Sequence, residues 1–115
     1  MQFTQQELDE LISQPGAPQL SGSDLSGAKL SGRHMVSADF SGANLRNAYL
    51  DGANLKNANL SGADLTGANL TNADLSGANL SNAKLVNARV VRANLNGADL
   101  RGTDFTDADM MGVER

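Results

Sequence analysis

The chain has 115 residues, with 13 acidic and nine basic side chains, a formal net charge of −4 and no cysteine or tryptophan. This length fits one domain, and the absence of cysteine excludes disulfides and thiolate metal sites. No apolar run approaches the roughly 20 residues that a membrane-spanning helix needs. The first residues are acidic and lack the basic start and apolar stretch of a secretion signal, so we expect a cytoplasmic protein.

The first 17 residues carry the signals of a short capping helix. Thr4 and Glu7 have the spacing of a capping box, in which each side chain bonds the backbone N–H of the other residue. We predict an amphipathic helix over residues 4–13, within a cap of residues 1–17 that covers one end of the following domain. The alternative is a frayed polar tail, since so short a helix is marginal by itself. The apolar side chains on the inner face of the predicted helix are Leu8, Leu11 and Ile12.

A five-residue repeat follows the cap. Every fifth residue from Leu20 to Met110 is large and apolar, which gives nineteen centres. Alanine stands two residues before fifteen of these centres, and glycine or asparagine stands two residues after sixteen of them. The period fits no α-helix, because five steps turn the side chain by about 140°. It fits no straight strand either, because an odd repeat would turn every second centre to solvent.

A bend in every repeat resolves this conflict. Glycine and asparagine tolerate positive φ, so the chain can turn a corner at each of their positions. Alanine and the centre can then both point inward, and successive coils stack as parallel strands about 4.8 Å apart. The pattern therefore predicts an all-β solenoid. The outward acids favour a coil of twenty residues, because coils of fifteen or twenty-five would stack like charges, such as Asp24 on Asp39 or Asp39 on Asp64.

Runs such as Ala43-Asn44-Leu45-Arg46-Asn47 and Ala63-Asp64-Leu65-Thr66-Gly67 resemble the pentapeptide-repeat family, whose motif is A(D/N)Lxx. The resemblance covers residues 18–112. It implies a right-handed quadrilateral β-helix with four pentapeptides per coil and nearly five coils, in which alanine and the centre lie inside. On this division residues 113–115 form a C-terminal tail.

Arg33 occupies one of the inward positions that alanine otherwise fills. A guanidinium cannot remain unpaired inside a leucine-lined coil, so it must be paired or turned outward. Since Arg33 lies in the first coil, we expect it to reach an acid of the cap, at Glu7, Asp9 or Glu10. This interpretation gives Arg33 a structural role in holding the cap.

The sequence offers little catalytic chemistry. His34, the single histidine, takes an outward position whose column neighbours in a twenty-residue coil are Asn54 and then Asp74, about 9–10 Å away and beyond metal-ligand reach. The core is filled by its own leucines, which leaves no evident cleft for a pair of carboxylates. We therefore predict no enzyme activity, no metal site and no cofactor.

A rigid surface for an unidentified protein partner is the function that we predict. Departures from the small polar exterior mark candidate contacts, because exposed tyrosine, arginine and apolar side chains together are typical of interfaces. The alternative is unselected variation on a tolerant exterior. The candidate contacts are Tyr49, Val86, Arg89, Val91, Arg92 and Met111.

The resemblance also implies a second function, since some members of the family mimic DNA and act on DNA gyrase. Such a mimic needs a sustained negative surface, whereas the residues after the cap carry ten acids against nine bases. Direct nucleic-acid binding is disfavoured because no basic stripe with stacking aromatics exists. The C-terminal end is apolar, at Met110, Met111 and Val113, which suggests either a homodimer through the last coil or truncation of a longer protein.

Overall fold

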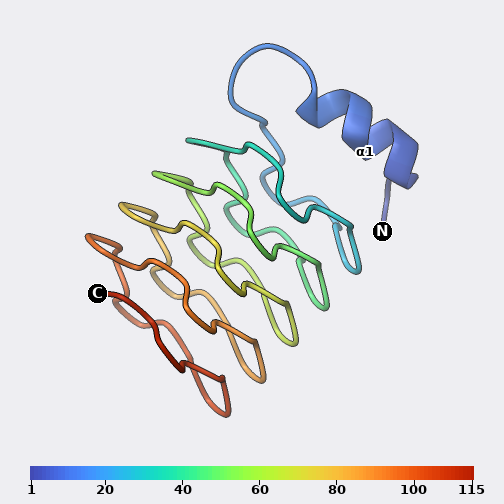
Figure 1. The fold of residues 1–115 in the computed structure, drawn as a ribbon. Coiled ribbons are helices and arrows are strands. Elements are labelled where there is room, and N and C mark those ends of the chain that lie inside the picture. The colour runs from blue at the N-terminus through green and yellow to red at the C-terminus, as the bar shows by residue number, and fades with distance from the viewer.

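Single-residue parallel β-bridges connect positions twenty residues apart along the whole repeat region, from Gln19↔Asp39 to Asn94↔Glu114. The computed structural model describes all residues from Met1 to Arg115, and its single regular element is the helix α1, Gln5–Ile12. No strand is longer than one bridged residue. The coils stack along one axis with α1 at the N-terminal end, and the molecule measures 33 × 22 × 21 Å (Figure 1). The predicted coil of four pentapeptides is confirmed.

Each repeat bonds the next coil at two backbone N–H groups. The Leu45 N–H donates to the Asp64 carbonyl at 2.7 Å, and the Asn47 N–H donates to the Thr66 carbonyl at 2.9 Å. A third bond closes the corner, where the Ala48 N–H donates to the Leu45 carbonyl at 3.1 Å. These bonds satisfy many of the backbone polar groups of the interior coils although no long strand exists.

The corners lie at the predicted positions. All nineteen residues two places after a centre have positive φ, eleven of them glycines with φ of 65–73°. Positive φ at the third residue of a turn is the requirement of a type II turn, and asparagine meets it at little cost. Three corners carry residues that meet it less easily, namely Ser37, Arg92 and Asp107, with φ of 61°, 55° and 57°.

The core is a column of leucine and alanine with no buried polar side chain. The centres from Leu20 to Leu95 are at most 4% exposed, and Phe40 is the largest side chain among them. Leu100, Phe105, Met110 and Val113 of the last coil pack against this core but are only partly buried. The interior therefore continues to the last coil without a break.

Outside the core, the bridge columns avoid like charges as expected: none of the bridges joins two acids, and Lys84 lies between Asp64 and Asp104.

Two boundaries differ in detail from the expected ones. Helix α1 is flanked by its caps Thr4 and Ser13, and the solenoid continues past residue 112, since Glu114 pairs with Asn94. No helix has the length and apolar character that crossing a bilayer would require.

Candidate interaction surface

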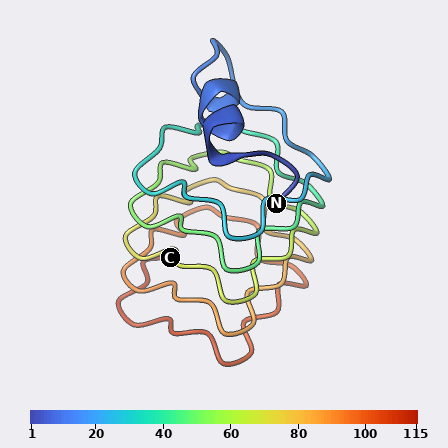
Figure 2. The same ribbon diagram turned by 90° about the vertical axis from the view of Figure 1, so that its right-hand side faces the viewer.

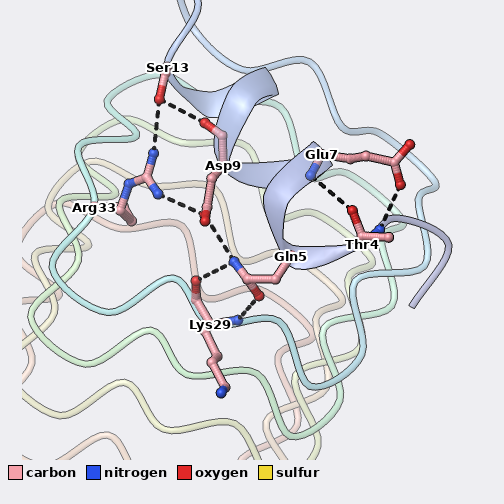
Figure 3. Close-up of polar contacts among 7 residues, drawn as sticks. All are labelled: Thr4, Gln5, Glu7, Asp9, Ser13, Lys29 and Arg33. Atoms are coloured by element: carbon pink, nitrogen blue, oxygen red, sulfur yellow. Dashed lines mark hydrogen bonds and ion pairs between the residues drawn. The ribbon is translucent and has the colours of Figure 1, made fainter.

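The cap closes the first coil with side-chain amides that replace a missing strand. The Gln5 Nε2 donates to the Lys29 carbonyl, and the Lys29 N–H donates to Gln5 Oε1, both at 2.9 Å (Figure 3). Gln2 bonds the neighbouring side of the coil in a similar way. Its backbone N–H donates to the Asp24 carbonyl at 3.0 Å, and its Oε1 accepts the Asp24 N–H at 2.8 Å. The cap thus satisfies the exposed edge of two of the coil's four sides.

Helix α1 lies over the end of the first coil (Figure 2). Its buried apolar face is narrow. Leu8 is fully buried and Ile12 is 7% exposed, whereas Leu11 is 43% exposed. The expectation that Leu11 shares the inner face is wrong, because residues four apart lie on one line of a helix and Leu11 falls about 100° to the side of Ile12. The Thr4–Glu7 capping box is present in full.

Arg33 turns towards the cap rather than into the core. Its Nη1 lies 2.9 Å from Asp9 Oδ1, and its Nη2 donates to Ser13 Oγ at 3.5 Å (Figure 3). Asp9 is one of the three acids expected to receive it. Both partners remain partly exposed, so the pair contributes at most about 1 kcal/mol, and its role in holding the cap stays a prediction.

The residue before each centre has a structural task that the five-residue period alone does not show. Thirteen of the nineteen such positions carry aspartate or asparagine, and in every one the side-chain Oδ1 accepts the backbone N–H two residues later, as in Asp39 to Ser41 at 2.9 Å. These Asx turns fix the start of each corner. A serine or threonine at the bonded position often donates its hydroxyl to the same oxygen.

Such bonds lower the pKa of Asp39, Asp74 and Asp99. The Ser41 hydroxyl and N–H hold the pKa of Asp39 below its ordinary value, and the Ser76 hydroxyl and N–H do the same for Asp74. At Asp99, the Arg101 side chain and N–H lower the pKa to about 2. These three carboxylates are therefore ionised near neutral pH. They accept hydrogen bonds from the backbone and do not have the raised pKa that a general acid would need.

One side of the solenoid departs from this scheme more than the others. We call it the Tyr49 face, and it comprises the bridge column Lys29, Tyr49, Asn69, Arg89 and Asp109 together with the corner after it, Ser31–Gly32, Asp51–Gly52, Thr71–Asn72, Val91–Arg92 and Met111–Gly112. Three of its five bridge positions lack the Asx residue, which is more than on any other side.

The structure brings most of the candidate contacts together on this face. Tyr49 is 50% exposed, Met111 is 72% exposed, and the side chains of Arg89 and Arg92 are also exposed. Val86, half-buried, stands at the corner that precedes the face. Val91 is only 7% exposed, so the expectation of an exposed valine is wrong. It lies between Thr71 and Met111 of the neighbouring coils, whose turns flank it on both sides.

No other arrangement suggests binding of a metal or small molecule. No three or more His, Cys, Asp or Glu side chains stand close enough to hold a metal ion. The single surface depression lies on the outer flank of the cap, lined by Phe3, Glu7, Glu10, Leu11 and Gln14.

Geometry of this kind defines a four-sided parallel β-solenoid, and comparisons with known proteins agree. Residues 38–77 and 73–112 match the family model for pentapeptide repeats (8 copies). The chain belongs to the pentapeptide-repeat family, whose members fold as right-handed quadrilateral β-helices. Among curated proteins, no sequence matches the chain.

Solved structures extend this result. A pentapeptide-repeat protein from the thylakoid lumen of Arabidopsis thaliana is 34% identical, with 98% of this chain and 70% of that one covered and a TM-score of 0.80. Rfr23 from the cyanobacterium Cyanothece 51142 is 35% identical over 89% of this chain and 67% of its own, with a TM-score of 0.61. QnrB1, a plasmid-mediated fluoroquinolone resistance protein, reaches a TM-score of only 0.44 at 27% identity, over 83% of this chain and 59% of its own.

Proposed function

We propose that the protein is a non-enzymatic interaction module that binds a partner protein through the Tyr49 face. The observation that carries the proposal is that residues which the backbone disfavours gather on this face. Tyr49 and Arg89 occupy positions where Asp or Asn would bond the backbone, and Arg92 occupies a positive-φ corner that Gly or Asn fills more easily. Residues that lower stability locally are expected where function requires them.

The energetic cost of these residues supports the proposal. An Asx bond contributes about 0.5–1.5 kcal/mol, and a non-glycine residue at positive φ costs about 1–2 kcal/mol. Lys84, by contrast, also lacks an Asx bond, but both of its bridge neighbours are aspartates, Asp64 and Asp104. Tyr49 has no acidic bridge neighbour, and Arg89 has one, Asp109, with which it forms no ion pair. Tyrosine and arginine are also the residues that most often dominate the binding energy of an interface.

Site-specific photo-crosslinking in the source cells tests this proposal. A photoreactive residue at Asn69, in the centre of the Tyr49 face, is expected to capture a partner. The matched control is Asn79 on the opposite side, because both asparagines are partly buried and accept one backbone N–H, at 3.1 and 2.9 Å. Capture from Asn69 alone supports the face. Equal capture from both positions, or none from Asn69, contradicts it.

A homodimer through the last coil is also proposed. The partly buried Leu100, Phe105, Met110 and Val113 supply the apolar surface for it, and Met111 lies beside them at 72% exposure. Sedimentation velocity over a range of concentrations tests the dimer, and a monomer at every concentration would contradict it.

A cytoplasmic location likewise stays a proposal, which fractionation of the source cells tests.

The alternative function, a DNA-mimicking modulator of DNA gyrase, is not favoured. Acids and bases are nearly balanced over the repeats, and three of the cations lie on the Tyr49 face, so this face does not resemble a phosphate backbone. A supercoiling assay with purified gyrase separates the two functions, because only mimicry predicts inhibition.

A further inference from the structure

We infer that the partner presents an acidic segment to the Tyr49 face, whose cations Lys29, Arg89 and Arg92 bind its carboxylates. This inference rests on the proposed function and names the chemistry of the partner. None of these three side chains forms an ion pair within the chain. Arg92 makes one hydrogen bond, from its Nε to the uncharged Asn72 Oδ1 at 3.1 Å.

On the other sides, Arg33, Arg46 and Arg101 form ion pairs, whereas Lys56, Lys84 and Arg115 do not. Besides Arg33 in the cap, Arg46 pairs with Asp64 at 3.1 Å and Arg101 with Asp99 at 2.6 Å. Lys84 is bridged on both sides to aspartates, and the charge of Lys56 helps to lower the pKa of Asp74. Of the six lysines and arginines without an ion pair, three lie on the Tyr49 face of a protein with a net charge of −4.

The two acids of the face do not neutralise these cations. Asp51 accepts the Ser31 hydroxyl at 2.6 Å, and Asp109 accepts the Met111 N–H at 3.2 Å. Asp109 is the bridge neighbour of Arg89, yet the two side chains do not form an ion pair. Three cations against two acids leave the face net positive, and the same acids would repel a continuous polyphosphate chain. Separate carboxylates fit this arrangement better than nucleic acid does.

Spacing favours an extended segment. Lys29 and Arg89 lie three coils apart in one column, about 14 Å at about 4.8 Å per coil. In an extended chain, residues four apart are separated by about 13 Å and point to the same side. Two acids at this spacing reach both cations, and the residue midway between them falls near the Tyr49 ring. Arginine can then hold a carboxylate through two parallel hydrogen bonds.

Fluorescence anisotropy with synthetic peptides tests the inference. The probe is a labelled extended peptide with two glutamates four residues apart and valine or threonine at the other positions. We expect it to bind at concentrations up to about 1 mM and to weaken with added salt. The same peptide with glutamine in place of glutamate should bind at least about tenfold more weakly. No binding of the glutamate peptide, or equal binding of both, overturns the inference.

The variant Arg89→Asn/Arg92→Gly removes two cations while giving each position the residue that its backbone prefers, so lost binding cannot reflect a damaged fold. It should bind the glutamate peptide at least about tenfold more weakly. The control Lys56→Ser/Lys84→Asn removes the same charge from other sides and should leave binding within about twofold. Equal loss in both variants overturns the inference.

The class of partner is tested separately. If a single-stranded oligonucleotide binds this face more tightly than the glutamate peptide, the acidic peptide is the wrong partner class and the inference fails. If crosslinking from Asn69 persists while the glutamate peptide does not bind, the proposed function stands and only the acidic partner is lost. If crosslinking from Asn69 fails while the peptide binds through Arg89 and Arg92, the carboxylate chemistry stands and the interaction module is lost.

Discussion

The corners allow a test in which two nearly identical substitutions should differ. Gly62 and Gly67 follow one another around the same coil with φ of 66° and 72°, so alanine at either position adopts the same disfavoured backbone conformation. This conformation costs about 1 kcal/mol. A Cβ at Gly62 meets nothing within 4 Å, whereas a Cβ at Gly67 overlaps Oδ1 of Asn47, which folds over this corner from the previous coil.

The overlap forces Asn47 out of its rotamer, at a further cost of about 0.5–1.5 kcal/mol. Gly67→Ala should therefore lower the free energy of unfolding by about 2 kcal/mol and Gly62→Ala by about 1 kcal/mol. In a chain of this size the difference corresponds to roughly 4 °C in Tm. Thermal and urea unfolding followed by circular dichroism measure both. The double variant Asn47→Gly/Gly67→Ala should be as stable as Gly62→Ala. Equal losses of stability in the two single variants, or a double variant no more stable than Gly67→Ala, refute the overlap.

Three further predictions concern charge, a corner and the cap. The bonds from Ser76 lower the folded pKa of Asp74 below 3.8, so its stabilisation is complete above about pH 4 and is lost as the pH falls through the folded pKa. Asp74→Asn keeps the acceptor, and its Tm should fall less below pH 4 than that of the wild type. Arg92→Gly should raise the free energy of unfolding by about 0.5–1 kcal/mol in urea denaturation, because φ of 55° suits glycine; a loss of stability would contradict this. Arg33→Ala should lower Tm little but speed subtilisin cleavage between α1 and the first coil, whereas unchanged cleavage would show that the Asp9 pair does not hold the cap.

Much of the fold could be predicted because each repeat position has one physical task. The five-residue period excluded helix and straight strand, the Gly/Asn positions located the corners, and the avoidance of stacked acids indicated the coil length. The Asx turns escaped prediction because Asp39 and its equivalents were assigned a direction, outward, but no partner. The signal was available, since aspartate or asparagine at a fixed distance before a turn is typical of a side chain that bonds its own backbone.

The surface was harder to predict because exposure depends on neighbours that are remote in sequence. Val91 takes an outward position, but Thr71 and Met111 flank it across the coils, and a window of local sequence does not show this. The helical spacing alone predicts Leu11 on the inner face of the cap. A helix that rests on the end of a narrow coil buries only one line of side chains, and Leu8 and Ile12 occupy it.

Regularity also makes the departures on the Tyr49 face interpretable. In a globular domain an exposed arginine has no equivalent position with which it can be compared. Here the equivalent positions in other repeats show which residue the backbone prefers. Arg89→Asn and Arg92→Gly restore those residues, so the two substitutions should raise stability and weaken partner binding together. Unselected variation of the exterior predicts the gain in stability without any loss of binding. The coupling between the two measurements therefore distinguishes a functional surface from a tolerant one.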